Sequence, residues 1–183
     1  PACVSPNGVR YSEASQSFRK FAEVCNIPFG ETQAGKSAVR WDHPLNLGGI
    51  GTTGNLAANT IAQQCDLVIG VGTRYSDFTT ASKTAFQNPQ VKFININLFE
   101  MDAFKHSGLA LTADARVTLE ELTQSVRGCQ VSPEYAGVIK NLKADWESET
   151  DRLYHLDHQP LPGQSEVIGA IRETIGPRDV MMS

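Results

Sequence analysis

The chain has 183 residues, of which 40% are hydrophobic and 20% are charged, as in ordinary globular proteins and unlike disordered ones. Its net charge of −4 excludes the basic surface with which proteins bind nucleic acids. No apolar run approaches the roughly 18 residues of a membrane-spanning helix. We therefore expect neither a nucleic acid nor a membrane as a partner.

Short apolar runs alternate with amphipathic helical patterns along the chain. This alternation predicts an α/β fold in three layers, Rossmann-like, with a mostly parallel sheet of about five or six strands and helices on both faces. The predicted strands cover residues 2–5, 27–31, 67–72, 91–97 and 109–112. The predicted helices cover 12–25 and 57–65, begin at a capping box of Thr118 and Glu121, and begin again at Ser132-Pro133-Glu134.

The composition changes at residues 158–163, where prolines and a glycine predict a linker. We expect residues 1–157 to form one domain and residues 164–183 to open another. In that second part Val167, Ile168, Ile171 and Ile175 predict a helix, and residues 179–183 predict a strand. Because the chain starts at Pro1 without a methionine, we expect a piece of a longer polypeptide.

Cysteine and histidine spacings indicate neither a disulfide framework nor a metal centre. No C-x-x-C pair occurs, so we expect buried, reduced thiols of a reducing compartment, the cytoplasm. His155 and His158 could share a helix face, but no third ligand accompanies them, and two solvated histidines are expected. The four cysteines are Cys3, Cys25, Cys65 and Cys129.

Residues 30–37 match the phosphate-binding pattern G-x-x-x-x-G-K-[ST]. A functional loop of this kind needs a helix beginning at its Lys-Ser, because the free amides of that helix hold the phosphates. Pro44 ends any such helix at or before His43, and no later strand supplies an acidic magnesium ligand in the right place. We therefore interpret the match as coincidental.

Residues 49–54 match the dinucleotide fingerprint G-x-G-x-x-G. That fingerprint must follow a strand directly, whereas residues 43–47 include a proline and polar groups and predict none. Thr73-Arg74 also occupies the region where an acidic residue is required. A glycine-rich loop that lets the backbone approach another chain or a ligand is the favoured interpretation.

The carboxyl ends of the predicted strands form a more credible ligand site, because ligands of open parallel sheets bind there. Arg74 could bind an anion at this edge, or it could pair with Asp77 or with a carboxylate at an interface, and the sequence leaves these possibilities open. Glu31 and Asp42 flank the loop after the second predicted strand, but they define no catalytic pair. The possible nucleotide crevice comprises Gly8, Gly72, Thr73, Arg74, Asn95 and Asp114.

An ordered series of motifs resembles the central domain of thiamine diphosphate-dependent enzymes, a family that includes acetohydroxyacid synthase, pyruvate oxidase and oxalyl-CoA decarboxylase. Within it, the chain looks like the ring-opening hydrolases of bacterial myo-inositol breakdown. The resemblance covers residues 1 to about 126. Its motifs are Glu31 to Ser37, Trp41 to Gly51, Asp66 to Arg74, Phe93 to Asn97 and Thr112 to Arg116.

The resemblance implies a three-domain, homo-oligomeric parent with thiamine diphosphate and Mg²⁺ bound between the first domain of one subunit and the third of its partner. The activating glutamate and the magnesium motif lie in those other domains, so this piece is expected to have no catalytic residue, no cofactor and no activity alone. Gly35-Lys36-Ser37 falls where relatives carry a loop facing the active site. The substrate that the resemblance implies is a cyclic 1,2-dione. In the parent, the cofactor carbanion would attack one carbonyl of this dione, the adjacent C–C bond would break, and water would release an open-chain acid.

Two functions remain open. The first is a scaffold and interface domain of a thiamine-dependent C–C hydrolase. The second is a nucleotide-binding domain that holds FAD or ADP in a carboligase or decarboxylase relative. The segments Tyr75-Ser76-Asp77 and Leu98-Phe99-Glu100 depart from the flavin-binding pattern and favour the first.

Overall fold

The computed structural model describes residues 1–5, 7–176 and 178–180, and the side chains of all of these except residues 3–5 and 7. The chain forms two compact units, Pro1–Lys143 and Ala144–Ser183, which are treated separately below.

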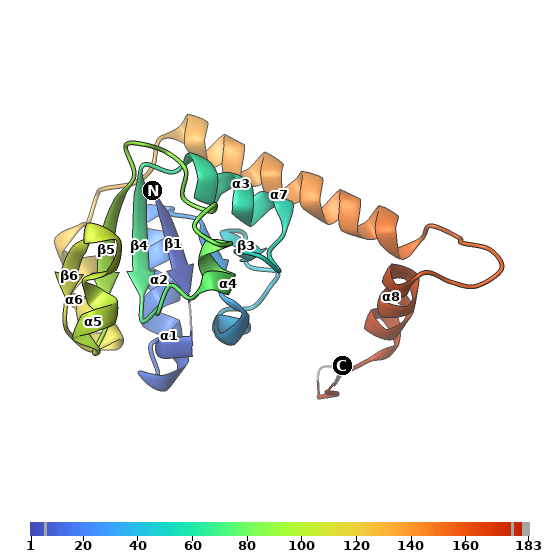
Figure 1. Cartoon of the computed structure of the whole chain (residues 1–183), viewed down its shortest axis with the longest axis horizontal. Coiled ribbons are helices and arrows are strands. Elements are labelled where there is room, and N and C mark those ends of the chain that lie inside the picture. Colours follow the sequence, from blue (N-terminus) through green and yellow to red (C-terminus); the bar gives the residue numbers. More distant parts are fainter. Residues whose placement is uncertain (6, 177, 181–183) are drawn as a thin grey trace. The chain divides into compact units, whose positions relative to one another are not determined.

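The first unit is built on a six-stranded sheet in the order β3-β2-β1-β4-β5-β6, in which every neighbouring pair is parallel (Figure 1). This confirms the predicted α/β fold class. The sequence analysis missed β3, a short strand next to Pro44. The strands are β1 Ala2–Ser5, β2 Phe29–Glu31, β3 Asn46–Gly49, β4 Leu67–Val71, β5 Lys92–Ile96 and β6 Leu109–Leu111.

Helices cover both faces of this sheet, because successive strand residues point to opposite sides. In β2, Phe29 packs its ring edge-on against Phe18 of α2 (Ser15–Cys25), with 5.1 Å between the ring centroids. The next residue, Gly30, faces Ala58 of α3 (Leu56–Gln64) on the other side. Helix α6 (Ala115–Ser125) lies beside α2. The result is the predicted three-layer arrangement.

Helix boundaries differ from the predictions in three places. Residues Asn7–Tyr11 form a short helix, α1, between the first predicted strand and the first predicted helix, where no helix was predicted. Helix α2 begins at Ser15 rather than Ser12 and buries the predicted apolar face. The capping box at Thr118 is wrong, because Asp114 caps α6 and Thr118 donates its hydroxyl to the Asp114 carbonyl. The remaining short helices are η1 Gln33–Gly35, α4 Asp77–Thr80, α5 Glu100–Ala103 and η2 Lys105–Ser107.

Helix α7 (Pro133–Tyr154) starts where Ser132 predicts it, and the Ser132 hydroxyl accepts a 3.2 Å bond from the Tyr135 amide. The Tyr135 hydroxyl donates to the Pro1 carbonyl at 3.0 Å, and Lys143 Nζ donates to the Asn46 carbonyl at 2.9 Å. Pro1 precedes β1 and Asn46 begins β3. The first part of α7 therefore crosses the amino ends of the strands and leaves their carboxyl ends to the loops.

The second unit contains the rest of α7 and α8 (Gln164–Thr174), which begins close to the predicted position. Its two histidines form ion pairs, His155 with Glu173 and His158 with Glu166, rather than a metal pair. The division between the units falls inside α7, whereas residue 157 remains our prediction for the domain boundary of the parent. Residues 178–180 form no strand, and residues 181–183 of the predicted strand lie outside the described residues.

Among the described residues, no helix is long and apolar enough to cross a membrane. Cys25 and Cys65 are buried, as expected. Cys129 is exposed, so the expectation of a buried thiol was wrong there, because this residue lies in the turn after α6 rather than on a packed helix face.

Candidate functional site

The strand order places a topological switch point between β1 and β4, where consecutive chain connections leave in opposite directions. Ligands of open parallel sheets bind beyond the carboxyl ends of the strands at such a point. Gly8 follows β1 and Gly72 follows β4, so the structure brings these two predicted site residues together.

Gly8 and Gly72 are in direct backbone contact. A Cβ atom added at Gly8 would lie 2.8 Å from the Cα atom of Gly72, closer than real Cβ atoms approach other atoms. Gly72 also has a φ of +71°, which side-chain-bearing residues rarely adopt. The two glycines therefore let the start of α1 close onto the end of β4, and backbone occupies the bottom of the predicted crevice.

Asn95 is buried, and most of its hydrogen-bonding capacity is used within the protein. Its Oδ1 accepts a 2.7 Å bond from the Tyr75 hydroxyl, while Nδ2 donates to the carbonyls of Ala103 and Lys105 at 2.9 and 2.8 Å. Three of the four hydrogen bonds that an asparagine amide can make are therefore internal. Asn95 shapes the loop after β5 and, in this conformation, offers little to a ligand.

Thr73 and Arg74 diverge after β4. The Thr73 hydroxyl is buried and accepts from the Tyr75 amide at 3.1 Å. The Arg74 side chain is exposed, and its carbonyl accepts a 2.6 Å bond from Lys105 Nζ. Asp77, the alternative partner considered for Arg74, instead accepts from Ser82 Oγ at 3.1 Å. Arg74 is thus a cationic side chain that the switch point presents to solvent.

Asp114 is a helix cap. Its Oδ1 accepts hydrogen bonds from the amides of Arg116 and Val117 at 2.9 and 3.2 Å. These amides, Val117 first, together with the Ser12 side chain, hold the pKa of the Asp114 carboxyl below its ordinary value of 3.8. An anionic Asp114 at a helix N-terminus is stabilised by the helix dipole.

The loop Gly35-Lys36-Ser37 is not a phosphate-binding loop. The Gly35 amide donates to Thr32 Oγ1 at 3.1 Å within η1, and turns rather than a helix follow until β3. The helix that a phosphate-binding loop of this kind requires is therefore not formed after Ser37. Lys36 is exposed, and its Cε lies 3.8 Å from where a Cβ at Gly49 would stand, so its stem lies over the glycine-rich stretch.

The glycine-rich stretch 49–54 does follow a strand, which corrects the sequence-based expectation. β3 ends at Gly49, and α3 begins at Leu56 after its cap Asn55, whose Oδ1 accepts from the Ala58 amide at 2.8 Å. Pro44 was taken as evidence against a strand, but β3 starts two residues later. Gly51 has a φ of +93° and lies against the Phe78 carbonyl, so this turn is filled by the neighbouring loop.

Glu31, at the carboxyl end of β2, is the residue whose role the sequence left open. Its side chain is only 5% exposed, and its Oε1 has no hydrogen-bond partner among the described residues. Burial raises the pKa of this carboxyl, whereas the Asn46 side chain, the amides of Val39 and Ser37, and the charge of Lys36 act in the opposite direction. An acidic residue at the end of a buried strand is the sequence signal that could have predicted a buried carboxyl with a raised pKa here.

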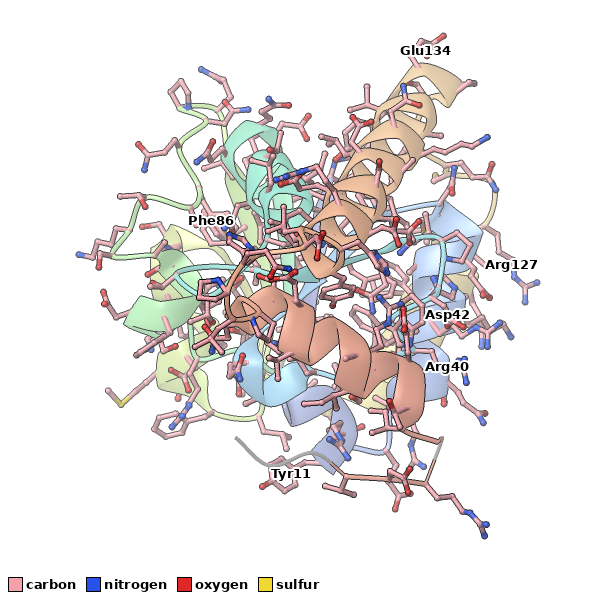
Figure 2. All side chains as sticks on the ribbon, turned by 90° about the vertical axis from the view of Figure 1, so that its right-hand side faces the viewer. Tyr11, Arg40, Asp42, Phe86, Arg127 and Glu134 are labelled. Atoms are coloured by element: carbon pink, nitrogen blue, oxygen red, sulfur yellow. The ribbon has the colours of Figure 1, made fainter. Side chains whose placement is uncertain are left out.

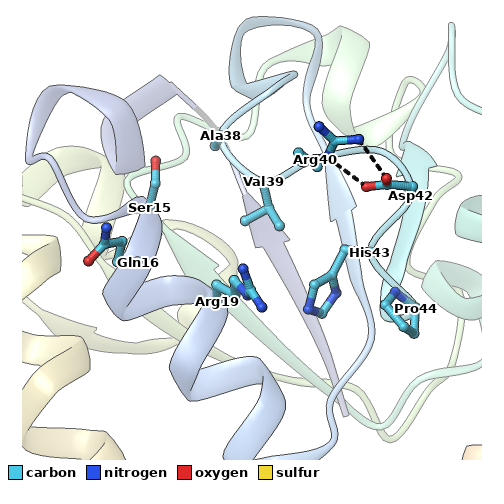
Figure 3. A pocket seen from close by; sticks show the side chains of 9 residues that line it. All are labelled: Ser15, Gln16, Arg19, Ala38, Val39, Arg40, Asp42, His43 and Pro44. Carbon is cyan, nitrogen blue, oxygen red and sulfur yellow. Dashed lines mark hydrogen bonds and ion pairs between the residues drawn. The ribbon is translucent and has the colours of Figure 1, made fainter.

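Asp42, the other carboxylate considered, lies elsewhere and is engaged by Arg40 through two hydrogen bonds of 3.0 and 2.7 Å (Figure 3). Figure 2 shows the two side chains next to each other on the surface. Glu31 and Asp42 therefore have separate partners and do not act as a pair.

A cleft of about 490 Å³ separates α2 from residues 38–44 and was not predicted (Figure 3). His43 Nδ1 accepts from the Leu45 amide at 3.2 Å, so a neutral His43 carries its proton on Nε2 and donates it to Glu23 at 3.0 Å. Glu23 also accepts from Arg19 at 2.8 Å. This network joins α2 to the loop before β3, over 20 residues of sequence separation that no local pattern reveals.

Comparison with known proteins identifies the surrounding architecture. The family model described as "Thiamine pyrophosphate enzyme, central domain" matches residues 1–122. The chain is 47% identical over 169 residues to 3D-(3,5/4)-trihydroxycyclohexane-1,2-dione hydrolase of Clostridium tetani, covering 92% of this chain and 26% of that protein. It is 47% identical over 175 residues to the protein of the same name from Bacillus anthracis, covering 96% and 27%.

A third relative, 3D-(3,5/4)-trihydroxycyclohexane-1,2-dione hydrolase 2 of Bacillus cereus, is 51% identical over 169 residues, covering 92% of this chain and 26% of that protein. The chain thus spans about a quarter of the length of the curated relatives that it matches.

Proposed function

This chain belongs to the thiamine pyrophosphate enzymes, as their central domain, and from that premise we propose that its parent is a hydrolase that opens the ring of a trihydroxycyclohexane-1,2-dione. The observation that carries the proposal is the identity of 47–51% to hydrolases of that name, which extends over 85–96% of the chain. The identity therefore reaches into the second unit as well as covering the sheet.

In this proposal the domain is a scaffold that binds no nucleotide of its own. The bottom of the switch-point crevice is occupied by the backbones of Gly8 and Gly72, and the amide of Asn95 is engaged within the domain. Both observations favour a sheet edge that is closed by the protein itself rather than one that is open to a nucleotide.

The alternative is a central domain that binds FAD or ADP. One observation favours it: the strand order creates a switch point, and Arg74 is exposed directly after β4. An arginine at this position could pair with a diphosphate. Gly8, Gly72, Thr73, Arg74, Asn95 and Asp114 remain the residues that would line such a site.

Thiamine diphosphate supplies the carbanion chemistry of the family when it is bound, and we place it and its Mg²⁺ on the other domains of the parent. Among the described residues, no three carboxylate, histidine or cysteine side chains are placed to hold a metal ion. The partners in this proposal are the other domains of the same polypeptide and further copies of the parent, in the cytoplasm.

Within the parent, we place the loop Gly35-Lys36-Ser37 against the substrate or the neighbouring domain. Lys36 is exposed, and its position is set by η1 on one side and by Gly49 on the other. A cation held in this way can orient an oxygen-rich substrate without taking part in bond breaking.

The test uses the full-length parent with thiamine diphosphate and Mg²⁺. We expect hydrolytic ring opening of the dione, measured as loss of the cyclic substrate and appearance of an open-chain acid. Activity only as a carboligase or decarboxylase would overturn the proposal.

A second test uses the chain itself. Calorimetry with ADP and absorbance after incubation with FAD are expected to detect no binding. Micromolar binding of either nucleotide that is lost in Arg74→Ala, but kept in the exposed control Arg127→Ala after α6, would establish the alternative function.

A further inference from the structure

The last turn of α2 and the segment after α6 lie side by side, although they are about 100 residues apart in the sequence. The Val131 amide donates to the Cys25 carbonyl at 3.1 Å, and Gln130 Nε2 donates to the Val24 carbonyl at 3.2 Å. The Cys129 amide donates to the Val126 carbonyl at 2.9 Å and so fixes the turn that precedes this contact.

Each of the two segments carries a cysteine. Cys25 is the last residue of α2 and is 4% exposed. Cys129 lies in the exposed turn, two residues before the amide that binds the Cys25 carbonyl. Arg127, two residues earlier, extends from the surface of the same turn (Figure 2).

The pKa of the Cys25 thiol also depends on the neighbouring Cys129. Burial raises the pKa of Cys25, and the charge of Cys129 raises it further. This influence is in keeping with the proximity of the two segments that the hydrogen bonds establish.

We propose that Cys25 and Cys129 are a redox-sensitive pair that closes into a disulfide when the protein meets a small disulfide oxidant. The exposed Cys129 thiolate attacks one sulfur of oxidised glutathione, forms a mixed disulfide and releases one glutathione thiolate. The Cys25 thiol then loses its proton and attacks Cys129 Sγ, which releases the second glutathione thiolate. Two protein thiols are oxidised and one glutathione disulfide is reduced.

The roles of the two sulfurs follow from their exposure. The accessible Cys129 reacts first because attack requires access to the oxidant. The buried Cys25 reacts second, because it meets only a sulfur that the fold already holds nearby. A disulfide formed in this way in a reducing compartment would be transient, as redox-sensing pairs are.

Closure would fasten α2 to the segment that enters α7. It would join residues about 100 positions apart, and a bond closing so long a loop restricts the unfolded chain strongly. The oxidised protein should therefore unfold at a temperature several degrees higher, and a dithiol reductant should reverse the shift.

The experiment incubates the folded chain with oxidised glutathione, alkylates the remaining thiols and maps the disulfides by mass spectrometry after trypsin. Cleavage after lysine and arginine puts the four cysteines on separate peptides, 1–10, 21–36, 41–74 and 128–140. We expect peptides 21–36 and 128–140 to be joined, and the thiol count of the unfolded protein to fall from four to two.

Three variants distinguish the proposal from its alternatives. Cys65→Ser keeps both Cys25 and Cys129 and should still form the linked peptides. Cys129→Ser and Cys25→Ser each remove one member of the pair and should not form them. Cys129 is exposed, so its replacement leaves the core unchanged and the result does not depend on a buried substitution. A persistent glutathione adduct on Cys129, or a bond between the Cys129 residues of two chains, would overturn the proposal.

Discussion

The hydroxyl of Tyr75 occupies the space that a side chain at Gly70 would need. Gly70 is the fourth of the five residues of β4, and Tyr75 folds back over it to donate its 2.7 Å hydrogen bond to Asn95 on β5. The ring is 7% exposed and lies edge-on to Phe86 and Phe93. The missing side chain of Gly70 therefore leaves the space that the Tyr75 ring fills at the carboxyl end of the strands.

Gly70→Ala should destabilise the first unit by about 1 to 3 kcal/mol, because the new methyl group displaces a packed ring. Tyr75→Phe should lose about 1 to 3 kcal/mol, since it leaves Asn95 Oδ1 buried without its donor. Denaturant unfolding measures both. The double variant should lose less than the sum, because each change breaks the same hydrogen bond.

Gly137→Ala is the matched control for this series. Gly137 lies within α7, and a Cβ there would meet no atom within 4 Å. Alanine should stabilise this helix by about 0.5 to 1 kcal/mol. A loss of stability at both glycines would mean that space around Gly70 is not the cause.

Glu31→Gln should remove a pH dependence from the stability of the domain. Burial raises the pKa of Glu31 in the folded state above its ordinary value of 4.5, so the folded protein binds the proton more tightly than the unfolded one. Its favourable contribution is complete below that ordinary value and is lost as pH rises towards the folded-state pKa. Glutamine mimics the protonated form and keeps the contribution.

The measurement compares unfolding midpoints of wild type and Glu31→Gln at several pH values between about 3 and 8, a range that extends to both sides of the ordinary carboxyl pKa. The variant should gain on wild type as pH rises. Glu23→Gln serves as a control of opposite sign, because His43 and Arg19 lower the pKa of Glu23 and its contribution is lost as pH falls. Parallel curves for wild type and Glu31→Gln would refute the buried-acid interpretation.

Lys36→Ala should leave the stability of the chain unchanged, because the side chain is exposed and its stem alone lies near Gly49. Isothermal calorimetry should detect no ATP binding before or after the change. In the parent enzyme we expect reduced turnover with an unchanged unfolding midpoint. ATP binding that depends on Lys36 would restore the phosphate-loop interpretation.

Asp114→Ala should destabilise the first unit by about 1 kcal/mol, the usual loss when a helix cap is removed. Asp114→Asn keeps an acceptor for the amides of Arg116 and Val117 and should lose much less. Thermal unfolding followed by circular dichroism compares the two. Equal losses would indicate that the charge of Asp114, rather than its capping oxygen, stabilises α6.

Long elements with regular apolar spacing were predictable from the sequence. Several residues together carry each of these signals. They are the apolar face of α2, the apolar run of β4, and the serine, proline and acid that start α7. β3 was missed because it is four residues long, contains two glycines and an asparagine, and derives its identity as a strand from pairing with β2. Such a strand has little local signal of its own.

The candidate site was predicted by position but not by contact. The switch-point residues were identified because the ends of parallel strands share one edge. That Asn95 would be engaged by Tyr75, or that Glu31 would be buried with an unpartnered oxygen, depends on side chains brought together by the fold. The Asp114 cap was overlooked because Thr118 and Glu121 offered a competing motif one turn later.

The bond between the Tyr135 hydroxyl and the Pro1 carbonyl has a consequence for synthesis on the ribosome. It joins residues 134 positions apart and anchors the entry to β1, a central strand whose neighbours β2 and β4 are translated later. β1 cannot pair on both sides until β4 has emerged from the ribosome. The amino ends of the strands are not covered until α7 has emerged as well. The sheet of this domain is therefore incomplete until its later strands and α7 have been synthesised.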